Sequence, residues 1–81
     1  MLNQTVLSFL NHAAEEARVT LPDSDASLFV SGVLDSFTLV DFVTVIENEY
    51  GIRVDDADLR PENFDTMQSV ERFVIRARGE Q

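Results

Sequence analysis

Apolar residues recur at steps of three and four in three stretches of the chain, and this spacing places them on one face of a helix. The first stretch covers residues 3–18, and its apolar face comprises Val6, Phe9, Leu10, Ala13 and Ala17. The last stretch follows residue 65, and its apolar face comprises Met67, Val70, Phe73, Val74 and Ala77. Each stretch is therefore predicted to be an amphipathic helix that buries one side in a common core.

The polar residues of these two helices lead to further expectations. His12 lies off the apolar face of the first helix and is expected to point into solvent, with no partner for metal binding or acid–base chemistry. The last helix is expected to begin at Asp65 or Thr66, because Asp65 stands three residues before Gln68 as in a capping box. Near its end, where cations complement the helix dipole, are Arg72, Arg76 and Arg78.

The middle stretch, residues 36–50, is predicted to be the most regular helix, and Gly51 is expected to end it in the left-handed conformation. With about 100° between successive residues, its core side comprises Leu39, Phe42, Val43, Ile46 and Tyr50. The opposite side, called the outer face below, comprises Phe37, Val40, Asp41, Thr44 and Asn48, with Glu47 at its margin. Apolar residues on an exposed face with acidic neighbours indicate a docking surface for a partner with a basic patch.

The remaining segments show little helical periodicity. Residues 19–34 are rich in turn-forming residues and are predicted to be a long loop, with Gly32 at positive φ. The residues expected to anchor this loop in the core are Leu28, Val30 and Leu34. After Gly51 we expect a short extended stretch at Ile52 and Val54, then a brief helix from Pro61 to Phe64. Residues 1–81 are thus predicted to form a single all-α domain, a small four-helix bundle of three principal helices and one short helix.

The composition restricts which kinds of partner the chain is expected to bind and where in the cell it is expected to be. Fifteen acidic residues against six arginines give a net charge of −9, which opposes nucleic acid and anionic membrane surfaces and favours basic partners. Hydrophobic residues make up 44% of the chain, which argues for a packed core rather than disorder. No uncharged apolar run approaches the length of a membrane span, and no leader is recognisable, so a cytoplasmic location without membrane insertion is expected.

Intrinsic catalysis and metal binding find little support in the sequence. The chain has no cysteine, so it has no disulfide, thiolate ligand or thiol nucleophile. A calcium loop starting at Asp23 would have Leu28 at the glycine position, so no metal site is expected. Ser36 lacks the flanking glycines of a nucleophile elbow and a histidine base. From the residues alone, Asp35 and Ser36 also fit an ordinary helix start.

The stretch Gly32-Val33-Leu34-Asp35-Ser36-Phe37 resembles the phosphopantetheine attachment motif of acyl carrier proteins. The order of an amphipathic helix, a long loop, Asp-Ser at the start of the second helix and a final amphipathic helix extends this resemblance over essentially all 81 residues. It implies that a magnesium-dependent transferase places 4′-phosphopantetheine from coenzyme A on Ser36, with Asp35 supporting the magnesium ion or the transferase complex. It also implies a carrier, not an enzyme, which holds acyl groups as thioesters on the thiol of this arm.

Two departures from the family's usual pattern leave the cargo open. Phe37 stands where leucine is usual, and Thr38 stands where carriers of fatty-acid synthesis often have an acidic residue. Acyl groups of fatty-acid, polyketide or related specialised biosynthesis are expected first, and aminoacyl or peptidyl groups, D-alanyl included, are the alternative. The expected partners of the monomeric chain are the transferase and acyl-loading and acyl-processing enzymes. An acidic helical adaptor without cargo is a further alternative, but it gives no reason for the placement of Asp35 and Ser36.

Overall fold

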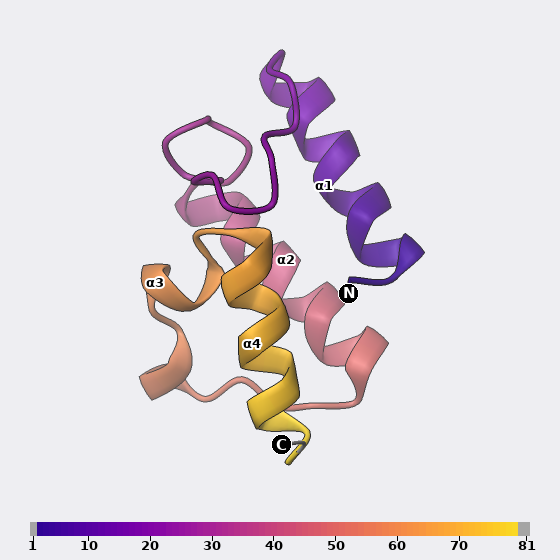
Figure 1. Ribbon diagram of the computed structural model, residues 1–81, viewed down its shortest axis with the longest axis vertical. Helices are drawn as coiled ribbons and strands as arrows, with labels where there is room; N and C mark the ends of the chain where they lie inside the picture. Colours follow the sequence, from indigo (N-terminus) through magenta and orange to yellow (C-terminus); the bar gives the residue numbers. More distant parts are fainter. Residues whose placement is uncertain (1, 80–81) are drawn as a thin grey trace.

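The computed structural model describes residues 2–79, which form an all-α domain. Four α-helices follow one another along the chain: α1 (Gln4–Ala17), α2 (Ser36–Tyr50), α3 (Pro61–Phe64) and α4 (Met67–Ala77). A 3-10 turn, η1 (Asp56–Asp58), precedes α3, and the described residues contain no strand. Figure 1 shows α1, α2 and α4 as the three long elements, with α3 beside the start of α4. The predicted bundle of three principal helices and one short helix is confirmed.

Most helix ends lie where local capping chemistry places them. Asn3 caps α1 by accepting a hydrogen bond from the Val6 amide (2.9 Å), and Gly51 ends α2 in the left-handed conformation (φ 64°). The predicted positive φ of Gly32 is also confirmed (90°). Because the stretch around Ile52 and Val54 pairs with no strand, it remains an irregular connection.

Of the two predicted caps of α4, Thr66 is confirmed, and the expected capping box between Asp65 and Gln68 does not form. Thr66 caps α4 instead: its hydroxyl accepts from the Ser69 amide (2.9 Å), and the Ser69 hydroxyl accepts from the Thr66 amide (3.1 Å). The Asp65 carboxylate is already committed to the hydroxyl of Ser27, which donates to it at 2.5 Å. A contact across 38 residues of sequence therefore decides between two adjacent candidate caps.

Aromatic rings at the centre of the core link all four helices. Phe42 of α2 stacks on Phe9 of α1 with ring centroids 5.6 Å apart, and it meets Phe64 of α3 edge-on at 6.5 Å. Phe64 in turn contacts Phe73 of α4 at 5.2 Å. Two predicted core residues, Ala17 and Ala77, are exposed, because each lies in the last turn of its helix, beyond the buried stripe.

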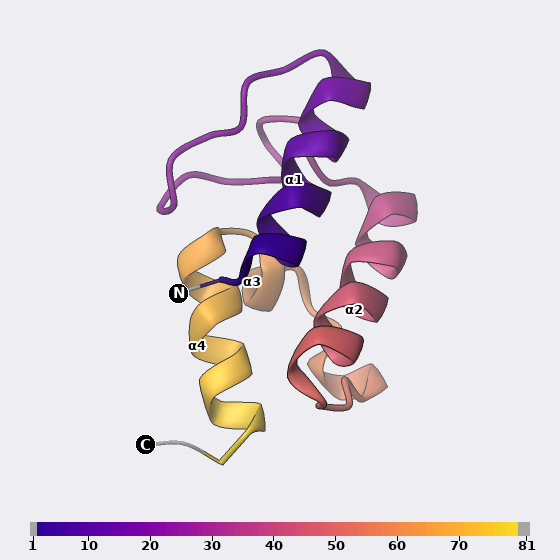
Figure 2. The same ribbon diagram turned by 90° about the vertical axis from the view of Figure 1, so that its right-hand side faces the viewer.

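The long loop between α1 and α2 is held against the start of α4. The backbone amide of Leu28 donates to the Asp65 carbonyl (2.6 Å), next to the side-chain bond from Ser27. Figures 1 and 2 both show the loop descending to the start of α4 before it returns to α2. Leu28 and Leu34 are buried as predicted, but Val30 is 89% exposed. The prediction for Val30 is wrong because the turn at residues 27–32 places it at its outer end, and Val33 is buried instead.

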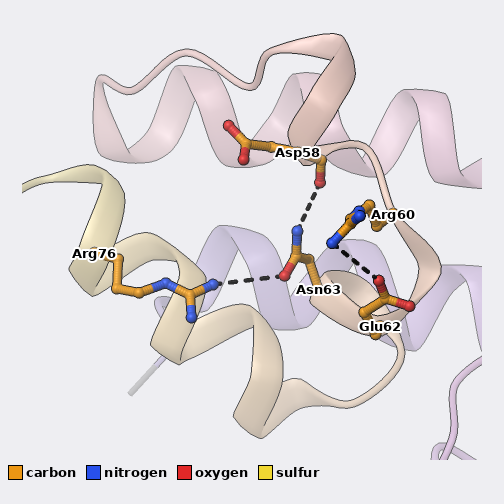
Figure 3. A network of polar contacts seen from close by, with 5 residues as sticks. All are labelled: Asp58, Arg60, Glu62, Asn63 and Arg76. Carbon is orange, nitrogen blue, oxygen red and sulfur yellow. Dashed lines mark hydrogen bonds and ion pairs between the residues drawn. The ribbon is translucent and has the colours of Figure 1, made fainter.

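Polar contacts of Asn63 join η1 and α3 to the last turn of α4 (Figure 3). Its side-chain amide donates to the Asp58 carbonyl (2.8 Å), and its side-chain oxygen accepts from Arg76 (3.5 Å). Arg60 and Glu62 form an exposed ion pair at 3.6 Å nearby. Arg76 therefore contacts a side chain of α3 in addition to lying near the negative end of the α4 dipole.

Candidate functional site

Ser36 is the first residue of α2 and is exposed at the point where the long loop becomes a helix. The preceding residue, Asp35, caps the helix: one of its carboxylate oxygens accepts from the amides of Phe37 and Thr38, both at 2.9 Å. The Thr38 hydroxyl accepts from the Asp35 amide (2.8 Å), which completes a capping box. The backbone on both sides of Ser36 is therefore fixed while its hydroxyl faces solvent.

The hydrogen bonds of this capping box also stabilise the charge of Asp35. The Thr38 amide, then the Thr38 hydroxyl and the Phe37 amide, lower the pKa of the Asp35 carboxyl below its ordinary value of 3.8, while partial desolvation acts the other way. A fixed negative charge thus lies one residue from the Ser36 hydroxyl at neutral pH. The two first-turn amides that point at this position are already occupied by the carboxylate.

The outer face of α2 is exposed, as the helical spacing predicts. Phe37 is 84% exposed and Val40 is 58% exposed, whereas Phe42, Val43 and Ile46 are buried on the opposite side. The polar members of the outer face that are also exposed are Asp41, Thr44 and Asn48. The face therefore combines two solvent-exposed apolar side chains with polar neighbours, directly beside Ser36.

Glu47, predicted at the margin of the outer face, has a local structural partner. It is partly buried, and its carboxylate accepts a hydrogen bond from the Val54 amide (2.8 Å) in the segment after α2. One of its two carboxylate oxygens is thus used within the chain. This contact could not be predicted from the sequence, because it depends on how the chain turns back after Gly51.

Comparison with known proteins assigns a family to this arrangement. The family model described as phosphopantetheine attachment site matches residues 8–74. The chain belongs to this family of carrier domains. No curated protein is similar enough in sequence to count as a match. Domains of this family serve as attachment sites for the 4′-phosphopantetheine prosthetic group and act as carriers, working with a phosphopantetheinyl transferase and with biosynthetic enzymes.

The residues of this carrier domain fit the prosthetic group. The match includes an exposed serine at a helix N-terminus, where the helix dipole favours a phosphodiester anion although the amides of Phe37 and Thr38 donate to Asp35. The described residues contain no group of three or more metal-ligating side chains, so a magnesium ion beside Asp35 would take its other ligands from outside the chain. None of the helices within residues 2–79 has the length and apolar character to cross a bilayer.

One feature near the site was not predicted from the sequence. His12 is exposed as expected, and its Nε2 atom lies 3.1 Å from the carboxylate of Glu16, which is also exposed. Both side chains line a hollow that also reaches Asp35 and Asp41 of the candidate site. The i,i+4 spacing of His12 and Glu16 is the signal that indicates their pairing. α1 thus contributes side chains to the surroundings of the candidate site.

Proposed function

We propose that Ser36 carries the 4′-phosphopantetheine arm and that the chain presents acyl groups, bound to this arm as thioesters, to partner enzymes. The supporting observation is an exposed hydroxyl at the first position of α2, held by the Asp35–Thr38 capping box inside the matched region. The arm supplies the thiol that forms the thioester; the chain itself has no cysteine. Rigid backbone on either side of Ser36 defines where the arm begins.

Asp35 has two roles in this proposal. Its capping oxygen keeps the loop-to-helix junction in place, and its second oxygen accepts no hydrogen bond from the described residues. That second oxygen is available to a magnesium ion held jointly with coenzyme A and the transferase. The cation also offsets the repulsion between the Asp35 charge and the incoming phosphate.

The outer face of α2 docks the partner enzymes. Phe37 and Val40 supply apolar contacts, because both are exposed next to Ser36. Asp41 supplies charge that steers a basic patch, and the net charge of −9 extends this steering over the whole molecule. The polar members Thr44 and Asn48 complete the contact, and Glu47 lies at its margin. Strong acidity favours acyl over aminoacyl or peptidyl cargo, and the carrier is proposed to act as a cytoplasmic monomer.

The attachment is tested by incubating the apo protein with coenzyme A, magnesium and a broad-specificity phosphopantetheinyl transferase. The intact mass should rise by one phosphopantetheinyl group, Ser36→Ala should remain unmodified, and Ser8→Ala, which changes an exposed serine on α1, should be modified like the wild type. An unmodified wild-type mass under conditions that modify a control carrier would contradict the proposal. The mass of a thioester trapped on protein from its own cell identifies the cargo.

A further inference from the structure

A groove lies between α1 and α2 beside the proposed attachment site. It encloses about 400 Å³ and is lined by the C-terminal half of α1, the end of the loop and the N-terminal half of α2. Its apolar lining includes Phe9, which is partly buried, and the buried residues Ala13 and Val33. Ala17 and Gly32 also line it, and their small size leaves the space open. We call this hollow the α1–α2 groove.

Three of the five polar residues that line the α1–α2 groove are acidic, and the other two are His12 and Thr38. Glu16 comes from α1, and Asp35 and Asp41 come from the start of α2. The only imidazole, His12, is paired with the Glu16 carboxylate at 3.1 Å. All six arginines of the chain lie within the described residues, and none of them lines the groove. Three carboxylates therefore surround an apolar floor with no guanidinium of this chain to neutralise them.

We propose that the α1–α2 groove receives an arginine or lysine side chain of the phosphopantetheinyl transferase. Such a side chain combines an aliphatic stem, which suits the apolar floor, with a terminal cation, which suits the acidic rim. The inference rests on the proposed attachment to Ser36, because the transferase must then contact the surface next to Asp35. Asp41 borders both the groove and the outer face, so a partner docked on the outer face can also reach the groove. α1 thereby becomes part of the recognition surface.

The test compares two adjacent glutamates of α1. Glu15 and Glu16 are both exposed, but only Glu16 lines the groove, so Glu15→Lys and Glu16→Lys change the net charge equally. In steady-state modification by the transferase at low ionic strength, Glu16→Lys should raise the KM for the carrier about five- to tenfold, as expected for a close charge pair, with little change in kcat. Glu15→Lys should change the KM less than about twofold, through the long-range field alone.

A second variant fills the groove without changing charge. Ala17→Leu places a larger apolar side chain in the groove and should also raise the KM, whereas Ala77→Leu, at an exposed position in the last turn of α4, should not. Equal effects of Glu15→Lys and Glu16→Lys, or no effect of Glu16→Lys, would overturn the inference. In all these cases, complete modification of every variant on long incubation would still support attachment at Ser36. Failure of the groove inference is thus distinguishable from failure of the Ser36 proposal.

Discussion

Asp35 combines a structural role with a proposed functional one because its two carboxylate oxygens have different surroundings. One oxygen accepts from two first-turn amides and from the Thr38 hydroxyl, and the other is left for a partner. A neutral capping residue could hold the helix start but would bring no charge to a magnesium ion. The different surroundings of its two oxygens explain how Asp35, together with Ser36, can form both a helix cap and the proposed attachment motif.

The lowered pKa of Asp35 predicts how the start of α2 responds to acid. Because the folded-state pKa is lower than the ordinary value of 3.8, the stabilisation is complete above that value and is lost as the pH falls through the folded-state pKa. In NMR titrations, the amide resonances of Phe37 and Thr38 should move together with a midpoint below 3.8. Asp35→Asn should abolish this transition. A midpoint at or above 3.8 would show that the capping box does not form in solution.

Local features of the site could be predicted from the sequence, and contacts distant in sequence could not. The bounds of α2 and the exposure of Phe37 follow from helical spacing and from the cap residues, which depend only on neighbouring positions. The true cap of α4 could not be chosen between Asp65 and Thr66, because Asp65 is taken by Ser27 from the long loop. The α1–α2 groove depends on how two helices pack, and no short motif encodes it.

At the scale of the element, α2 is proposed to separate stability from recognition by its two faces. Phe42 is fully buried between the rings of Phe9 and Phe64, whereas Phe37 is exposed on the opposite side of the same helix. Burial of an aromatic side chain contributes to folding only where water is excluded from it. The two phenylalanines, five residues apart, are therefore expected to have unrelated roles.

Paired substitutions in α2 test this separation. Phe37→Ala and Asp41→Arg should raise the KM for the transferase while leaving the helical circular dichroism and the melting temperature nearly unchanged, since both residues are exposed. Phe42→Ala should lower the free energy of unfolding by about 3–5 kcal/mol, because it removes a buried ring from a packed core. Unfolding of the domain by Phe37→Ala would show that this ring is part of the core.

At the scale of the whole molecule, the long loop is a structural component that joins the first half of the chain to the second. Leu28 lies in the same buried cluster as residues of α1, α2, α3 and α4, and its amide bonds to the carbonyl of Asp65. The backbone of the loop also closes on itself, since the Leu34 amide donates to the Leu28 carbonyl (3.0 Å). The segment that leads into Ser36 is thus positioned by residues far from it in sequence.

Substitutions of two loop residues, Leu28 and Val30, test how strongly the loop is anchored. Leu28→Ala should cost about 2–5 kcal/mol in urea unfolding, because it leaves a cavity in place of a fully buried side chain of the core cluster. Val30→Ala should change stability by less than about 0.5 kcal/mol, because Val30 is 89% exposed. Hydrogen exchange of the Leu34 amide should accelerate in Leu28→Ala and stay unchanged in Val30→Ala, since only the first change loosens its acceptor. Equal losses of stability in the two variants would mean that the turn at residues 27–32 packs inward in solution, and that the start of α2 is held by other contacts than those of Leu28.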